Sequence, residues 1–191
     1  MSVRIETCPK CGQSLQPTDK KCPKCRTEVM VRSFTSVAEM PPIMVNKYIA
    51  EYKKASAQNP DDKDLNISLG VCFMRLKKYD QALAAFEKAQ PDNFDAPEPF
   101  FYAAVCRLGG KKPFLHTLPE IKKMEEDIEA ANMIDEQPIH HYFLSYIKQD
   151  YYKRKFLRTS PTADEELQTA YDMGLSQGDI EAFHAMIGLQ P

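Results

Sequence analysis

Four cysteines near the start of the chain have the residue type and the spacing that bind a metal ion. Cys8 and Cys11 form one Cys-x-x-Cys pair, ten residues follow, and Cys22 and Cys25 form a second pair. Zinc takes four tetrahedral ligands, and a Cys-x-x-Cys turn presents two sulfurs at the separation that one ion needs. We therefore predict one Zn²⁺ ion held by these four cysteines. Because all four ligands are protein atoms, no position stays open for water or substrate, which indicates a structural metal.

Disulfides, a redox Cys-x-x-Cys and a sulfur-ligated iron centre are the alternative interpretations of these cysteines. Duplicated pairs at this spacing in an intracellular chain are typical of metal ligands and not of disulfides. Iron is the main remaining alternative to zinc, because a tetrahedral sulfur site accepts either metal.

The segment that must position the cysteines is too poor in large apolar residues to fold around a core of its own. Residues 1–27 therefore need the metal as a staple. Residues 28–40 have some alternation of apolar and polar residues, which predicts a short strand and a linker that ends at Pro41 and Pro42. We divide the chain into a metal-binding module (1–32), a linker (33–42) and a helical domain (43–191).

The two cysteine pairs resemble the short zinc ribbons found at the ends of many bacterial and archaeal proteins. The resemblance lies in the Cys-Pro-x-Cys-Gly sequence of residues 8–12 and in its second copy at residues 22–25. It implies a small β structure around the ion. Arg26 follows the second pair where glycine is usual, so we expect some strain in that turn.

Beyond Pro42 the apolar residues recur at helical spacing. Two stripes are Leu65, Leu69, Cys72, Phe73 and Leu76, and then Tyr79, Ala82, Phe86 and Ala89. Only Lys77 and Lys78 separate the two stripes, which predicts a tight turn and an antiparallel helical hairpin.

This hairpin resembles a tetratricopeptide repeat. The signature positions within residues 63–96 are occupied by Leu69, Gly70, Phe73, Ala82, Phe86 and Ala89. One period of 34 residues earlier, Tyr48, Tyr52, Ala55 and Pro60 match the second helix of a preceding repeat whose first helix is missing. The resemblance covers about residues 44–132, and residues 170–182 are similar to Sel1-like repeats. The fold class that we predict is mainly α: a small β zinc ribbon followed by an α-solenoid of about seven helices.

The same resemblance implies a peptide-binding groove lined by the first helix of each hairpin. The groove residues would be Asp64, Ile67, Val71, Met74, Arg75, Phe101, Val105 and Leu108. A largely apolar groove with a few charges suits a helical or extended peptide of a protein partner. The alternative is that the chain's own C-terminal helices cover these residues, because a short solenoid must cap itself.

Charge limits the partners that the sequence suggests. The formal net charge is −2, which excludes a broadly basic surface for nucleic acid. Residues 1–32 hold seven basic and three acidic residues, a formal +4 that falls to about +2 once four thiolates bind one zinc ion. Phosphate contacts would come from Lys10, Lys20, Lys21, Lys24 and Arg26. The simpler interpretation is that these bases solvate a small module.

Nothing in the sequence indicates a catalytic centre or a membrane-inserted segment. There is no run of about 20 apolar residues. We interpret Cys72 and Cys106 as buried, His140 and His141 as polar residues at a helix start, and Tyr152 and Phe156 as packing inward from a helix that runs to Leu157. We expect a non-enzymatic, cytoplasmic protein-interaction adaptor, and the alternative is a nucleic-acid-associated regulator that reads through the zinc ribbon.

Overall fold

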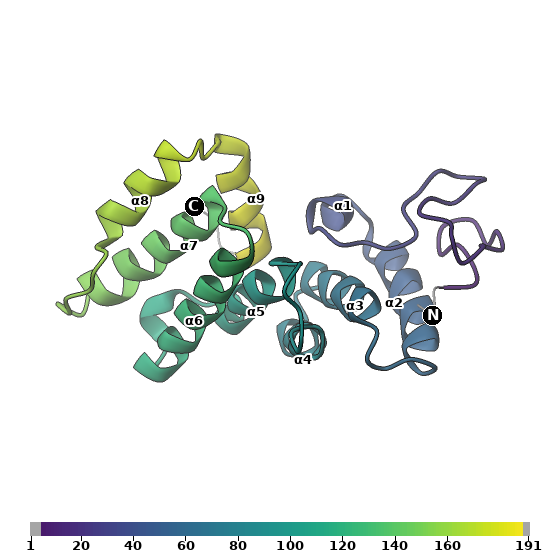
Figure 1. The fold of residues 1–191 in the computed structure, drawn as a ribbon, viewed down its shortest axis with the longest axis horizontal. Coiled ribbons are helices and arrows are strands. Elements are labelled where there is room, and N and C mark those ends of the chain that lie inside the picture. Colours follow the sequence, from purple (N-terminus) through teal and green to yellow (C-terminus); the bar gives the residue numbers. More distant parts are fainter. Residues whose placement is uncertain (1–4, 189–191) are drawn as a thin grey trace. The chain divides into compact units, whose positions relative to one another are not determined.

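The computed structural model describes residues 5–188 and divides the chain into two compact units. Unit 1 is Met1–Asn93 and unit 2 is Phe94–Pro191. The regular secondary structure of the described residues is helical, with nine α-helices (Figure 1). The predicted mainly helical fold is therefore confirmed.

Unit 1 contains four helices after the cysteine-rich segment. They are α1 (Thr35–Ala38), α2 (Pro42–Ser56), α3 (Lys63–Arg75) and α4 (Tyr79–Ala89). The Asp62 side chain caps α3 by accepting a hydrogen bond from the Leu65 N–H at 2.9 Å. At the other end of α3, Lys77 takes a left-handed φ of 57° and the Lys78 N–H bonds the Phe73 carbonyl. This tight turn folds α4 back on α3, as the spacing predicts.

The α3–α4 hairpin depends on a close approach at Gly70. A Cβ at this position would lie 2.5 Å from Cε1 of Phe86, whose ring is fully buried. Glycine is thus required because the aromatic ring of α4 fills the space beside the α3 backbone. These are two of the tetratricopeptide signature positions, and the structure gives them the packing role that the resemblance implies.

We expect Gly70→Ala to destabilise unit 1 by about 2 kcal/mol. Overpacking against a fixed ring costs about 1–3 kcal/mol, and the better helix propensity of alanine offsets part of this. Urea unfolding of the two proteins measures the difference. In a Phe86→Leu background the same substitution should cost less than half as much, and an equal cost in both backgrounds would contradict the packing explanation.

The prediction of β-strands in the N-terminal segment is wrong. Among the described residues there are two isolated bridges, Thr7 with Ser14 and Lys21 with Glu28, and no strand. Each bridge closes a short loop whose turn presents two cysteines. The backbone pairing therefore stops at the bridge and does not continue as a strand. Farther on, the backbone at Val29 and Val31 bonds the hydroxyl of Tyr52 instead of a neighbouring strand. The linker then forms the one-turn helix α1.

The cysteine-rich segment shares a compact unit with α2, α3 and α4, and this unit ends at Asn93. Its few apolar residues Ile5, Leu15, Val29 and Val31 are buried. Tyr48 and Tyr52, one turn apart on α2, are buried and reach the backbone of this segment through their hydroxyls. The segment thus folds onto a helix of the repeat domain.

The described part of unit 2 contains five α-helices, four of which form two pairs packed side by side. They are α5 (Glu98–Leu108), α6 (Leu118–Ile134), α7 (Pro138–Ile147), α8 (Ala163–Asp172) and α9 (Gln177–Ile187). A 3₁₀ turn (Pro113–Leu115) precedes α6, and a π-helical turn (Lys148–Lys153) continues α7. Helix α5 packs on α6 and α7 on α8, while α9 contacts both α5 and α7. Phe183 of α9 lies 4.8 Å from Phe143, which places an aromatic contact in the core.

Candidate metal centre

The four cysteines lie on two loops that repeat each other with a spacing of 14 residues. We name these loops knuckle 1 (residues 6–15) and knuckle 2 (residues 20–29). In knuckle 1 the Gly12 N–H bonds the Cys8 carbonyl at 2.8 Å, and in knuckle 2 the Arg26 N–H bonds the Cys22 carbonyl at 2.9 Å. The outer pairs also correspond, Leu15 to Glu6 and Val29 to Lys20. The local sequence therefore builds the same turn twice.

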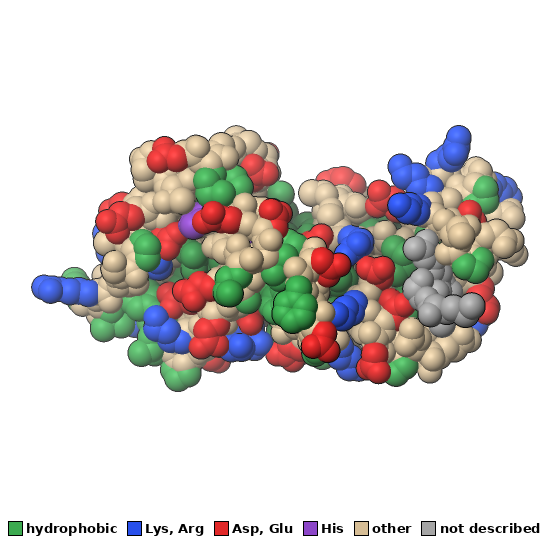
Figure 2. Space-filling model, viewed as in Figure 1, with side chains coloured by type: hydrophobic (Ala, Val, Ile, Leu, Met, Phe, Trp, Pro, Cys, Tyr) green, Lys and Arg blue, Asp and Glu red, His purple; other side chains and the backbone are tan. Residues whose placement is uncertain are grey.

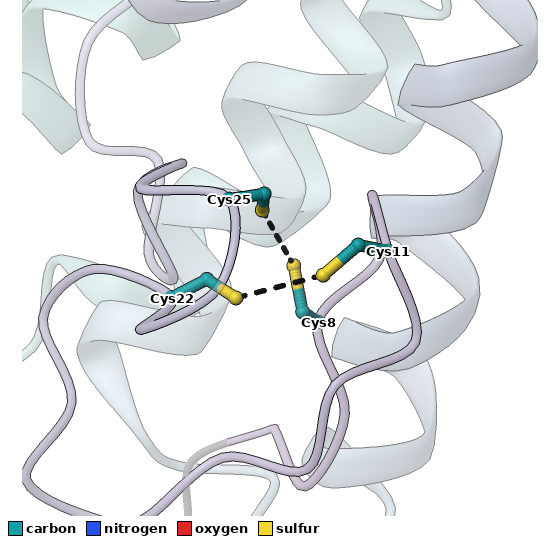
Figure 3. A group of neighbouring side chains, drawn as sticks. All are labelled: Cys8, Cys11, Cys22 and Cys25. Atoms are coloured by element: carbon teal, nitrogen blue, oxygen red, sulfur yellow. Dashed lines mark hydrogen bonds between the residues drawn. The ribbon is translucent and has the colours of Figure 1, made fainter.

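The sulfur atoms of the two knuckles converge on one point (Figure 3). All four Sγ atoms lie within 4.8 Å of one another. The two pairs across the knuckles are separated by 3.5 Å (Cys8 to Cys25) and 3.6 Å (Cys11 to Cys22), far longer than the ~2.05 Å of a disulfide. In a tetrahedral zinc site with Zn–S bonds of about 2.3 Å, neighbouring sulfurs are about 3.8 Å apart. The cluster thus fits a tetrahedral metal ion.

The environments of the thiols differ between the inner and the outer side of the cluster. Cys8 and Cys22 are buried, whereas Cys11 and Cys25 are partly exposed. Burial raises the pKa of Cys8 to about 12, and hydrogen bonds with Thr27 lower the pKa of Cys25 to about 6. A metal ion that binds here must displace the proton of Cys8, so binding releases protons.

Helix α2 holds both knuckles in place through one face. The Tyr52 hydroxyl donates to the Val29 carbonyl at 2.8 Å and accepts from the Val31 N–H at 3.1 Å. Close to Tyr52 on α2, Glu51 accepts a hydrogen bond from the Thr7 hydroxyl at 2.7 Å, and Lys54 pairs with Glu6 at 3.1 Å. The sequence pattern assigns Tyr52 to the repeat alone. A contact outside the repeat was nevertheless predictable, because a buried tyrosine hydroxyl needs a hydrogen-bond partner.

The two knuckles differ at the residue that takes a left-handed backbone conformation. Gly12 has a φ of 72° and Arg26 a φ of 61°. A side chain in this region costs about 1–2 kcal/mol, whereas glycine adopts it freely. Both knuckles take the same backbone conformation, so the strain expected at Arg26 comes from the presence of its side chain.

We expect opposite effects from exchanging these residues. No atom lies within 4 Å of a Cβ at Gly12, so Gly12→Ala should cost about 1.5 kcal/mol through the backbone alone. Arg26→Gly should stabilise knuckle 2 by about 0.5 kcal/mol, because part of the relieved strain is offset by the entropy of an unfolded glycine. Urea unfolding of the metal-loaded proteins measures both changes, and a loss in stability with Arg26→Gly would contradict this account.

The basic residues of the knuckles face solvent. Lys10, Lys20, Lys21, Lys24 and Arg26 are exposed, and Figure 2 shows basic side chains gathered over the N-terminal loops. Their placement is compatible with phosphate contacts and with simple solvation.

The groove residues predicted on α3 lie against the chain's own residues 32–40. Ile67, Val71 and Met74 are buried, and α1 packs on α3. At one end Asp64 pairs with Arg32 at 3.4 Å. At the other end the Arg75 guanidinium donates to the carbonyls of Val37, Ala38 and Met40 at 2.8–3.1 Å. Segment 32–40 thus runs along α3 from its start to its end.

The groove residues predicted on α5 are also buried. Phe101, Val105 and Leu108 have at most 5% of their surface exposed. The Phe101 ring lies 4.9 Å from that of His140 on α7, and α9 packs on α5. Unlike the four cysteines, the predicted groove residues do not line a single open surface within either unit.

The isolated cysteines and His140 occupy interior positions. Cys72 and Cys106 are buried, and burial raises the pKa of Cys72 to about 12, which keeps it a neutral thiol. His140 is buried, and its Nδ1 lies 2.7 Å from Oδ1 of Asn132. These contacts are those of core residues.

A buried ion cluster between α7 and α8 was not expected from the sequence. The Glu166 carboxylate accepts from Lys148 Nζ at 2.5 Å and contacts Nδ1 of His141 at 2.7 Å. Nε2 of His141 lies 2.9 Å from Glu136. The interacting pairs are 5, 18 and 25 positions apart with no motif spacing, so only the folded chain identifies them. Each charge has a partner, and the cluster joins α8 to α7.

Comparison with known protein families identifies one repeat. The family model described as tetratricopeptide repeat matches residues 49–99, from within α2 to the start of α5. No curated protein and no solved structure matches the chain. The chain thus contains a tetratricopeptide-type repeat where the sequence predicts it, while the zinc-ribbon and Sel1-like resemblances stay predictions. No helix among residues 5–188 is long and apolar enough to cross a membrane.

Proposed function

We propose that this protein is a non-enzymatic, cytoplasmic protein-interaction adaptor in which one structural zinc ion holds the N-terminal knuckles against tetratricopeptide-type helices. The observation that carries the proposal is the four-sulfur cluster packed, through Tyr48 and Tyr52, on the helix that precedes the matched hairpin. Four thiolates fill the coordination shell of zinc, which suits a structural role. Reduced thiols also suit a reducing compartment such as the cytoplasm.

The contact between segment 32–40 and α3 supports an interaction role. Arg75 binds three backbone carbonyls, which is a way to hold a peptide whatever its side chains are. A partner peptide that uses Ile67, Val71 and Met74 must displace this segment. Repeats of this type commonly mediate protein interactions, and the α3 face is where we place the partner.

The test is affinity purification from the source cells with and without nuclease treatment. An adaptor retains the same protein partner after nuclease, and the partner is also retained by a bait with Lys20→Gln, Lys21→Gln and Lys24→Gln. Partners that vanish with nuclease and with this triple substitution would favour the nucleic-acid-associated regulator. Metal analysis of the purified bait should find one zinc ion per chain, and stoichiometric iron would refute the zinc assignment.

A further inference from the structure

The end of α7 in unit 2 places an exposed phenylalanine where helices usually place glycine. The Leu157 N–H bonds the Tyr152 carbonyl at 2.9 Å and the Phe156 N–H bonds the Lys153 carbonyl at 3.2 Å, which is a Schellman motif. Phe156 has the left-handed φ of 56° that this motif requires, and 94% of its surface is exposed. The helical turn ends at Lys153, so the expected inward packing of Phe156 is wrong, although Tyr152 is buried.

Three further apolar side chains are exposed around this position. They are Leu157, Leu115 (69% exposed) and Leu118. The 3₁₀ turn that contains Leu115 lies against the π-helical turn, because the Phe114 N–H bonds Asp150 at 2.8 Å and Lys155 donates to the His116 carbonyl. We name the surface formed by Leu115, Leu118, Phe156 and Leu157 the α7-end patch.

Basic residues predominate around the α7-end patch. Residues 111–118 and 149–158 contain six basic residues and one acidic residue, a formal +5 in a chain whose net charge is −2. The bases are Lys111, Lys112, Lys153, Arg154, Lys155 and Arg158. The acid, Asp150, is bound by Arg154 at 2.8 Å and by the Phe114 N–H. Figure 2 shows basic and hydrophobic side chains together at the end of unit 2 that carries this loop.

Two of the bases are held in place by neighbouring aromatic rings. The Arg154 guanidinium lies 4.1 Å from the Phe114 ring centre, and Lys155 Nζ lies 3.9 Å from that of Tyr151. Such contacts order the side chains before any partner binds, which lowers the entropy that binding must remove.

We propose that the α7-end patch docks on an anionic membrane surface. Phe156 and Leu157 enter the interfacial region, and the surrounding bases contact the lipid phosphates and carboxylates. A side chain that is 94% exposed projects from the protein and does not line a hollow. A lipid interface closes around such a side chain, whereas a protein partner needs a matching pocket. Contact of this kind requires no membrane-spanning helix.

The experiment is co-sedimentation of the full-length, metal-loaded protein with vesicles. Vesicles of phosphatidylcholine with about 30% phosphatidylserine should bind it, and pure phosphatidylcholine vesicles should not. Phe156→Gly should weaken binding about tenfold, because the inserted ring is lost. Glycine suits the left-handed position, so the melting temperature should stay the same or rise, and the loss cannot come from misfolding.

The contribution of the basic residues to vesicle binding is tested by a triple variant with Lys112→Gln, Lys153→Gln and Arg158→Gln. Each lost base weakens binding about fivefold, so the triple variant should lose about 100-fold. Two matched controls should bind as the wild type does within about threefold. One is Lys20→Gln, Lys21→Gln and Lys24→Gln in unit 1. The other is Met133→Ala, an equally exposed apolar residue about 22 Å along α6 from Leu118.

Four outcomes would overturn the proposal. The first three are no binding to the phosphatidylserine vesicles at low salt, unchanged binding by Phe156→Gly, and an equal loss of binding with the unit 1 triple variant. The fourth is that the protein does not bind vesicles but binds a single-stranded RNA oligonucleotide, and that this RNA binding is lost in Phe156→Gly. The patch would then be a nucleic-acid surface.

Discussion

Removal of the metal ion is expected to unfold both knuckles and to loosen the start of the helical repeat. A structural zinc ion contributes about 10–16 kcal/mol of apparent binding free energy in small metal-folded peptides. Few large apolar residues support the knuckles, namely Leu15 and Val29 with the flanking Ile5 and Val31, so apolar burial cannot replace that contribution. Unfolded knuckles no longer cover Tyr48 and Tyr52. The free energy of unfolding of the rest of unit 1 should therefore fall by about 4 kcal/mol.

Chelation followed by nuclear magnetic resonance measures this effect. The amide resonances of residues 5–31 should collapse to unfolded positions, those of α2 should shift, and readdition of zinc should restore both. Cys22→Ser with Cys25→Ser should reproduce the chelated state without chelator. As a control, Cys72→Ala should still bind one zinc ion, because Cys72 lies outside the cluster. Unchanged resonances for residues 5–31 after complete metal removal would refute the metal-dependent fold.

Acid should destabilise unit 2 through His140 by about 3 kcal/mol between pH 7 and pH 4. Burial lowers the pKa of His140 to about 4 from an ordinary value of 6.5. The nearby His141 charge acts in the same direction, while Asp135 and Glu136 oppose it. Between these two pKa values the unfolded chain binds a proton at His140 that the folded chain does not bind. Stability is therefore fully present above pH 6.5 and falls as the pH decreases towards 4.

Titration of the His140 ring protons gives the folded pKa directly. The stability change follows from urea midpoints of unit 2 resonances at pH 7 and pH 4, compared between the wild type and His140→Leu. Titratable groups that do not interact with His140 contribute equally to both proteins and cancel in the difference. The stability advantage of the wild type over His140→Leu should shrink by about 3 kcal/mol at the lower pH. A ring that titrates near 6.5 would contradict the burial argument.

The convergence of the four cysteines and the matched repeat followed from the sequence because each depends on short-range spacing. Two Cys-x-x-Cys pairs need only local turns to bring their sulfurs together, and the same hydrogen bonds form in both knuckles. The α3–α4 hairpin likewise follows from two helical stripes and a two-residue turn. Gly70 and Phe86 are 16 residues apart on adjoining helices, so their contact is decided by the hairpin itself.

Only the tertiary structure decided where the knuckles dock and what covers the helices. The hydroxyl of Tyr52 bonds a backbone 21 and 23 residues away, and this contact replaced the strand that alternation predicted. The apolar residues Ile67, Val71 and Met74 fit an open groove and a covered helix face equally well, because the same amino-acid pattern is expected for either. Phe156 looked like a core residue by helical spacing, and it became exposed because the helix ended three residues earlier. Local spacing determines which atoms can meet within a turn or a hairpin, whereas contacts between distant segments depend on the shape of the whole unit.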